Sequence, residues 1–464
     1  MSNLIKTIWL TMLLAISLRE VRIYAQTSSR IEHITEFYRQ RDGFMGTAAV
    51  ARNGRIVFEK NYGYANLKQQ MPFAQDTRFP VGSVSKQFTA AAILLLQQDG
   101  KLKTSDPIAK FYKGAPASWA HIVLRNLLTQ TSGLPDFNFS EAVRHGPRRP
   151  QETIQTVIEQ PLRFEPGKAY DYSNANYVLL GMVIEGASGE PYCRFLQERI
   201  FEPLRLTQTG CGWRSGSIPH GASGYRPAAT GLVAAESDDL TSISGAGSLY
   251  STTADLIRWT SALYGGRVLN RSSLKEMITP FLDGYAYGLE VDDGKRIGHN
   301  GVIDGFYVAV DYLPKTRTIV VVLSNVNSDG NQRSPGAFAM ETELIELAID
   351  KHSILPSEGN ELYFPDEILR RYVGRYRATD SHNPASFEVS LNGDHLVLQL
   401  DGSSGSAAQL RAESQSDFYV ADQEVEVDFD QPGSAVVIDY NGHSTIQFVR
   451  EREQNIPGAG KQNR

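Results

Sequence analysis

The pattern of apolar and polar positions divides this chain of 464 residues into an α+β region and an all-β region that follows it. Near the start, residues 28–40 have helical spacing, and the segments 47–51 and 55–59 flank Asn53-Gly54. That dipeptide favours a type I′ turn because both central positions need a positive φ. We therefore predict a helix followed by a β-hairpin.

Helical spacing dominates the middle of the chain. From Ser83 to about Gly100 the sequence is apolar on nearly every helical face, which is typical of a helix buried in a large core. Further helices are predicted at 122–128, 154–159, 177–187, 194–201, 253–264 and 338–350, and strands at 296–299, 306–312 and 318–324. Strands at both ends with helices between them predict one α+β domain whose sheet is completed by distant parts of the chain.

The pattern changes after residue 353. Residues 354–360 contain Pro356 and Gly359 and predict a linker. Short alternating segments follow at 387–391, 395–400, 418–420, 425–429, 435–440 and 445–450. Regularly spaced short strands predict a small β-barrel or sandwich over residues 361–452, and residues 453–464 are predicted to be disordered.

The first 25 residues predict a signal peptide. An apolar run from Thr7 to Leu18 precedes a polar stretch that ends in Ala25. A membrane anchor is the alternative, but the run is shorter than the roughly 20 apolar residues of a spanning helix, so no stable membrane span is expected. The first domain is then residues 26–353, and the protein is expected to be secreted or periplasmic. Cys193 and Cys211 either form one disulfide or remain two buried free thiols.

Composition limits the classes of function. The composition, with 41% hydrophobic and 21% charged residues, is typical of a globular protein, and the chain is long enough for two domains. A net charge of -6 and the lack of a Lys/Arg block interleaved with aromatics argue against a nucleic-acid partner. A small-molecule or peptide substrate is expected instead. The nine histidines show no metal-ligand spacing, so neither a metal nor another cofactor is expected.

Three short motifs follow one another in the order that a serine-acylating active site needs: Ser83-Val84-Ser85-Lys86, Tyr172-Ser173-Asn174 and His299-Asn300-Gly301. Each is weak alone, since Ser272-Ser273-Leu274-Lys275 and Tyr64-Ala65-Asn66 repeat the first two patterns. Context separates the copies, because Ser272 lies in a mixed, solvated stretch and Tyr64 soon after a strand hairpin.

The first motif is predicted to open the buried helix. There, unpaired backbone N–H groups and the helix dipole stabilise an anion at Ser83, and the Lys86 amine, one turn later, can reach the Ser83 oxygen. The alternative is a helix-capping serine beside a surface lysine. In the second motif, a lysine ammonium is expected to supply much of the roughly 4 kcal/mol needed to lower the pKa of Tyr172 by about three units. Asn174 is expected to orient Lys86 and to donate to a substrate carbonyl.

The third motif is expected at the end of the strand 296–299. Gly301 would let a substrate backbone approach closely, and the N–H groups of Val302 and Ser83 would form an oxyanion hole. For the second motif the alternative is a half-buried core tyrosine. For the third it is a hairpin turn rich in Asn and Gly.

Together the motifs resemble the penicillin-recognising serine hydrolases, the group of class C β-lactamases, D-alanyl-D-alanine carboxypeptidases and related esterases and D-aminopeptidases. Supporting stretches are residues 127–135, 172–181, 201–204 and 247–252, and the resemblance covers roughly residues 32–350. It implies a β-lactamase/transpeptidase-like fold with an antiparallel sheet flanked by helices. It also implies that Ser83 is acylated, that Lys86 and Tyr172 transfer protons, that Asn174 binds and orients, and that His299 to Gly301 form the far wall of the site. The C-terminal β region resembles lipocalin-like appendages.

One departure bears on the substrate. Class C β-lactamases carry Lys-Thr-Gly where this chain has His299-Asn300-Gly301, and a histidine with a pKa of about 6.5 is only partly charged at neutral pH. We therefore expect a serine hydrolase that acts through an acyl-enzyme on amide or ester bonds, as a D-amino-acid peptidase, carboxypeptidase or esterase. The alternatives are a class C-like β-lactamase and a penicillin- or ligand-binding protein with little turnover.

Overall fold

The computed structural model separates the chain into two compact units, residues 1–353 and 354–464. Each unit is considered by itself. The residues that the structure describes are 28–144, 149–228, 231–236, 238–327, 336–350, 357, 366–379, 386–393, 395–401, 407–412, 417–420, 425–431, 434–439 and 444–451. The predicted signal peptide, nearly all of the predicted linker and the predicted tail lie outside these residues.

An antiparallel six-stranded sheet forms the framework of the first unit, with the strand order β10-β11-β12-β13-β1-β2. Its strands are β1 (Gly46–Arg52), β2 (Arg55–Tyr62), β10 (Glu290–Asp292), β11 (Arg296–Ile303), β12 (Phe306–Leu313) and β13 (Thr318–Ser324). Residues far apart in sequence meet in it, since β1 pairs with β13. Asn53 and Gly54 both have positive φ, 52° and 75°, which confirms the predicted type I′ hairpin between β1 and β2.

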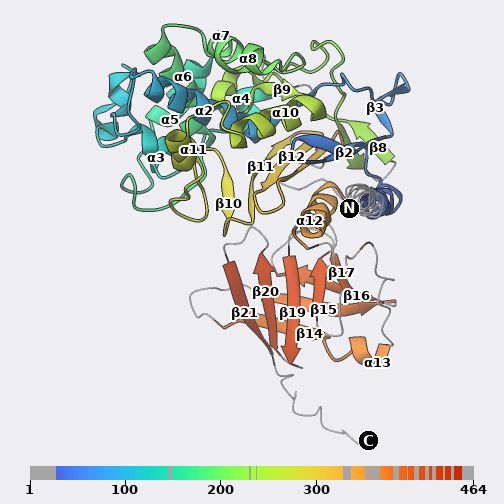
Figure 1. The fold of residues 1–464 in the computed structure, drawn as a ribbon. Helices are drawn as coiled ribbons and strands as arrows, with labels where there is room; N and C mark the ends of the chain where they lie inside the picture. Colours follow the sequence, from blue (N-terminus) through green and yellow to red (C-terminus); the bar gives the residue numbers. More distant parts are fainter. Residues whose placement is uncertain are drawn as a thin grey trace, which may run out of the picture. The chain divides into compact units, whose positions relative to one another are not determined.

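The helices from α2 to α11 gather to one side of this sheet (Figure 1). Their central members are α2 (Ser85–Gln98) and α6 (Asn174–Ser188), which pack against each other and are buried over residues 85–96 and 175–184. The first unit also contains the α-helices α3 (Leu124–Leu128), α4 (Phe139–Arg144), α5 (Pro150–Ile158), α7 (Tyr192–Leu196), α8 (Glu202–Leu204), α9 (Ser244–Gly247), α10 (Thr253–Tyr264), α11 (Arg271–Met277) and α12 (Ala337–Ile349). Residues 28–42 are also helical.

Short strands complete the first unit. They form three small sheets: β3 (Tyr64–Asn66) with β4 (Met71–Pro72); β5 (Phe79–Pro80) and β6 (Gly210–Cys211) on either side of β9 (Leu249–Ser251); and β7 (Tyr225–Ala228) with β8 (Gly231–Ala234). Cys193 and Cys211 are both free thiols, and Cys193 is exposed rather than buried. Among the described helices, none is long and apolar enough to cross a bilayer.

The second unit contains a closed antiparallel barrel of eight strands. These are β14 (Gly374–Ala378), β15 (Ser386–Asn392), β16 (His395–Leu400), β17 (Ala408–Ala412), β18 (Asp417–Val420), β19 (Val425–Gln431), β20 (Ser434–Asp439) and β21 (Ser444–Arg450), and the short helix α13 (Asp366–Leu369) precedes them. The pattern of turns had predicted six of the strands and had missed β14 and β17. Aromatic side chains dominate the core, where Tyr376 stacks on Phe387 with ring centroids 5.1 Å apart.

Candidate active site

Ser83 lies in a tight 3-10 turn, η1 (Gly82–Val84), immediately before α2. The sequence had predicted Ser83 as the first residue of the buried helix, so the helix starts two residues later than expected. Gly82 has a φ of 49°, a conformation that glycine adopts without steric cost. Ser83 itself stays half-buried between fully buried neighbours, so its hydroxyl group is presented at the edge of the core.

Lys86 lies in the first turn of α2 and is completely buried. Its Nζ contacts three oxygens: Ser83 Oγ at 2.9 Å, Asn174 Oδ1 at 2.8 Å and the Ala246 carbonyl oxygen at 2.8 Å. Desolvation lowers the pKa of Lys86 to about 7, although the charge of Asp136 opposes that shift. A neutral amine has two N–H groups and one lone pair. The charged amine donates to all three oxygens. In the neutral form the oxygens of Asn174 and Ala246, which can only accept, hold the two N–H groups, and the lone pair faces Ser83.

Tyr172 approaches Ser83 from the loop before α6 and donates its hydroxyl to Ser83 Oγ at 2.8 Å. Desolvation raises the pKa of Tyr172 well above its ordinary value, against the smaller effect of the Ser83 hydrogen bond. The expected lysine-supported phenolate is therefore wrong: the tyrosine stays protonated, and the lysine, with its pKa of about 7, is only partly charged at neutral pH. When Lys86 is neutral, the hydrogen bonds run in one direction, from Tyr172 to Ser83 to Lys86.

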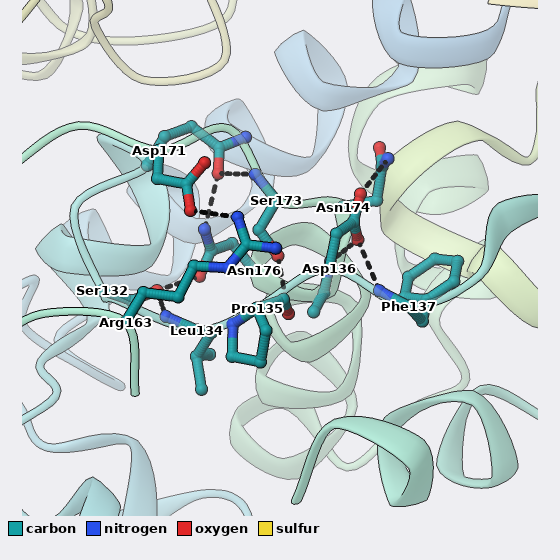
Figure 2. Close-up of polar contacts among 12 residues, drawn as sticks. Ser132, Leu134, Pro135, Asp136, Phe137, Arg163, Asp171, Ser173, Asn174 and Asn176 are labelled. Carbon is teal, nitrogen blue, oxygen red and sulfur yellow. Dashed lines mark hydrogen bonds and ion pairs between the residues drawn. The ribbon is translucent and has the colours of Figure 1, made fainter. Parts of the chain in front are cut away.

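Asn174 is the first residue of α6 and lies between Lys86 and a carboxylate that the motifs did not include. While its Oδ1 accepts from Lys86, its Nδ2 donates to Asp136 Oδ2 at 2.9 Å (Figure 2). Beside this pair, Asn176 donates to Gln130 and accepts from Ser132 at 2.6 Å, so buried amides brace the start of α6. These contacts fix the backbone from which Asn174 projects.

His299 occupies the middle of β11, not the end of a strand as predicted, and β11 continues to Ile303. The hairpin-turn alternative is thereby excluded for the H-x-G motif. The Nδ1 atom of His299 lies 2.6 Å from the Asn300 carbonyl oxygen. Because that oxygen can only accept, Nδ1 carries the proton. The Nε2 atom then accepts from the Tyr285 hydroxyl at 3.2 Å. Burial lowers the pKa of His299 to about 4, so this residue is neutral at pH 7.

Gly301 brings the backbone of β11 against the turn that carries Ser83. A Cβ atom at Gly301 would lie 2.1 Å from the Val81 carbonyl oxygen and 3.1 Å from the Ser83 nitrogen. No side chain other than hydrogen fits this approach. Val302, the next residue, is paired with Tyr307 of β12, and β11 thus runs directly beside the turn η1.

The duplicate motifs lie apart from this arrangement. Ser272 and Lys275 are exposed on α11, and the exposed Tyr64 begins β3. Three contributors were missed: Asp136, Tyr285 and the Ala246 carbonyl. Asp136 and Ala246 had a local signal, since they directly flank the stretches 127–135 and 247–252 that supported the family resemblance.

The geometry provides a hydroxyl group with a neutral amine as proton acceptor and a protonated phenol as proton donor. Such a set can activate a serine for attack on a carbonyl carbon. Within the described ranges, no group of three or more His, Cys, Asp or Glu side chains is arranged to hold a metal ion.

Comparison with known proteins agrees with this chemistry. The β-lactamase family matches residues 32–341, which is more than half of the chain. The chain belongs to the β-lactamase family. Its members' shared fold is the β-lactamase/transpeptidase-like arrangement of antiparallel sheet and helices seen in the first unit, and the family is one of serine hydrolases.

Individual members of the β-lactamase family extend the comparison. PbpX of Bacillus subtilis, whose name places it among the penicillin-binding proteins, is 33% identical over 305 residues, covering 66% of this chain and 76% of PbpX. Penicillin-binding protein 4* of Bacillus subtilis is 28% identical over 432 residues, covering 86% of this chain and 93% of that protein. A D-amino acid amidase from Ochrobactrum anthropi, solved with L-phenylalanine amide, is 27% identical with a TM-score of 0.62, covering 70% of this chain and 99% of the amidase.

Proposed function

We propose that this protein cleaves amide or ester bonds through an acyl-enzyme on Ser83, with D-amino-acid peptides, amides and esters as its substrate class. The observation that carries the proposal is the pair of hydrogen bonds at Ser83 Oγ, one to Lys86 Nζ at 2.9 Å and one from the Tyr172 hydroxyl at 2.8 Å. They place a proton acceptor and a proton donor on the same nucleophile. A penicillin-binding protein and a D-amino acid amidase among the relatives support the same class.

In the first step, Lys86 takes the Ser83 proton while Ser83 Oγ forms a bond to the substrate carbonyl carbon. The backbone N–H groups of Ser83 and Val302 hold the resulting oxyanion. As the bond to the leaving group breaks, Tyr172 gives that group its hydroxyl proton, and the Lys86 ammonium returns a proton to the Tyr172 oxygen. Water then attacks the acyl-enzyme in the same manner, which releases the acid and returns the proton to Ser83.

The substrate proposal depends on His299. Because His299 is neutral at pH 7 and its Nε2 is engaged by Tyr285, this wall of the site offers no positive charge to a substrate carboxylate. We infer that uncharged amides and esters are favoured over substrates that need a carboxylate anchor. A D-amino-acid amidase or esterase activity therefore takes precedence over a carboxypeptidase or a dedicated β-lactamase.

A substrate panel tests the proposal directly. Purified protein is assayed with a D-amino-acid amide, a D-amino-acid peptide, a p-nitrophenyl ester and a chromogenic cephalosporin. Wild type should hydrolyse an amide or ester, Ser83→Ala should lose that activity, and Ser272→Ala, the exposed copy of the motif, should retain it. Equal activity of wild type and Ser83→Ala would falsify the assignment of Ser83.

Intact mass after exposure to penicillin separates the other candidates. A persistent adduct on wild type without turnover of any substrate would identify a penicillin-binding protein, and rapid cephalosporin turnover would identify a β-lactamase. Ester or amide turnover without a lasting penicillin adduct is the expected result.

We further propose that the protein is exported and acts in the periplasm or outside the cell, on the apolar run from Thr7 to Leu18 that precedes Ala25. Amino-terminal sequencing of the protein from cell fractions tests this. A mature chain that begins at Gln26 is expected, and an uncleaved cytoplasmic chain would contradict the proposal.

A further inference from the structure

Asp136 presents its carboxylate to the first residues of α6. Its Oδ1 accepts from the backbone N–H groups of Phe137 at 3.0 Å and Ala175 at 3.3 Å, and its Oδ2 accepts from Asn174 Nδ2 at 2.9 Å (Figure 2). Three donors therefore hold the carboxylate in place, and two of them are backbone groups that a rotation of the side chain cannot replace.

This contact decides which way the Asn174 amide faces. A carboxylate only accepts hydrogen bonds, so Nδ2 must face Asp136 and Oδ1 must face Lys86 Nζ, 2.8 Å away. In the reversed orientation Asn174 Oδ1 would face the Asp136 carboxylate, and the Nδ2 donor would face the Lys86 amine. The carboxylate thus determines the partner that Lys86 meets.

We infer that Asp136 is a positioning residue of the acyl-transfer reaction, which acts through Asn174 to hold Lys86 with its lone pair directed at Ser83 Oγ. This inference rests on the proposed function and assigns no contact between Asp136 and substrate. It extends the three motifs by a fourth element, carried on the loop between α3 and α4.

The negative charge of Asp136 also acts on the pKa of Lys86. The titratable groups around Lys86 are Asp136, Tyr172, Tyr177 and His299, and Glu290 acts on Tyr172 and His299. Burial keeps the two tyrosines and the histidine neutral at pH 7. Burial also raises the pKa of Asp136, against the hydrogen bonds from Asn174 and Phe137 that favour its charged form, and Asp136 supplies the negative charge that acts on Lys86. That charge raises the pKa of Lys86 against the larger lowering by desolvation. Removing it should lower the Lys86 pKa further.

The test is the pH dependence of kcat/KM for the best ester or amide of the panel, since its acid limb reports the pKa of the base in the free enzyme. In Asp136→Asn the plateau should fall by about ten- to a hundredfold, part of the roughly 100- to 10,000-fold that a positioned base contributes. The acid limb should also move to lower pH. Asp136→Glu keeps the charge, so its limb should remain at the wild-type pH while the plateau falls.

Asp171→Asn is the matched control. Asp171 is a neighbouring carboxylate that pairs with Arg163, and its removal should change neither the plateau nor the limb. A lower plateau with an unmoved limb in Asp136→Asn would reduce Asp136 to a structural residue and overturn the inference. Should Asp136→Asn melt below the assay temperature, Asp136→Ser takes its place. An active Ser83→Ala would refute the proposed function instead, whatever the Asp136 variants do.

Discussion

In the first unit, buried positions around Ser83 hold a lysine and a histidine, whereas the buried side chains described in the barrel are aliphatic or aromatic. Lys86 and His299 both have lowered pKa values because burial disfavours their charged forms. The barrel core instead pairs rings, as in the stack of Tyr376 on Phe387. The difference indicates that the first unit accepts unfavourable desolvation to prepare a reactive group, while the described core of the barrel contains no buried ionisable side chain of this kind.

The largest expected effect comes from Lys86→Met. Without the amine, kcat/KM should fall by about 100- to 10,000-fold because the serine loses its proton acceptor. The free energy of unfolding of the first unit should rise at pH 6 by about 1–4 kcal/mol, because an apolar side chain replaces a buried amine there. Activity assays and calorimetric melts measure the two quantities. A variant that lost both activity and stability would contradict the claim that burying Lys86 is unfavourable for the stability of the first unit.

Phe387→Ala tests the second unit, which contains the barrel. The Phe387 ring is buried between Tyr376 and Phe448, and its loss should destabilise the barrel by about 3–5 kcal/mol. Denaturant unfolding followed by the barrel's aromatic signal gives the change. Activity at a temperature where the barrel variant stays folded should remain at the wild-type level. A parallel loss of kcat/KM would show that the site depends on the barrel.

Gly301→Ala combines both kinds of effect within the first unit. The added methyl would meet the Val81 carbonyl oxygen, so β11 must move away from the turn of Ser83. We expect a loss of about 1–3 kcal/mol in stability together with reduced kcat/KM. Gly393→Ala in the barrel is the contrast: nothing lies within 4 Å of its added Cβ, so any cost there comes from its φ of 65° and not from a clash, and kcat/KM should stay unchanged. Unchanged activity in Gly301→Ala would contradict the close approach.

The most gradual expected effect is a pH dependence of stability, which is small for each unit of pH. Between pH 7 and about 10 the unfolded chain holds a proton on Lys86 that the folded protein has lost, so the stability of the first unit should increase with pH. The slope contributed by this group is about 1.4 kcal/mol per pH unit. Calorimetry should show the transition of the first unit moving up over this interval in wild type. In Lys86→Met this contribution should be absent, and persistence of the full slope there would exclude Lys86 as its source.

The sequence predicted much of what lies close in the chain. Ser83 and Lys86 are three residues apart beside an apolar run, and the structure places their side chains in contact. The Asn53-Gly54 hairpin and the helix from Thr253 to Tyr264 were likewise readable from turn chemistry and periodicity. Local rules suffice where the contacting groups are neighbours in sequence.

Other features depended on distant parts of the chain. The burial that neutralises Lys86 and protonates Tyr172 comes from elements far away in sequence, so the expected phenolate was wrong. Asp136 and Asn174 lie 38 residues apart, and no periodicity links them. His299 was predicted at the end of a strand, yet pairing with β12 carries β11 on through Asn300 and Gly301. Tertiary pairing there outweighs local propensity.

The closed barrel of the second unit has a consequence for what that unit can do. Eight strands enclose an interior just wide enough either for side chains or for one small ligand. Here the rings of Tyr372, Phe418 and Phe429 meet inside it, with centroids 4.8 to 5.6 Å apart. The part of the interior that these rings occupy is closed to a ligand, so the ring cluster acts there as a plug rather than as a lining.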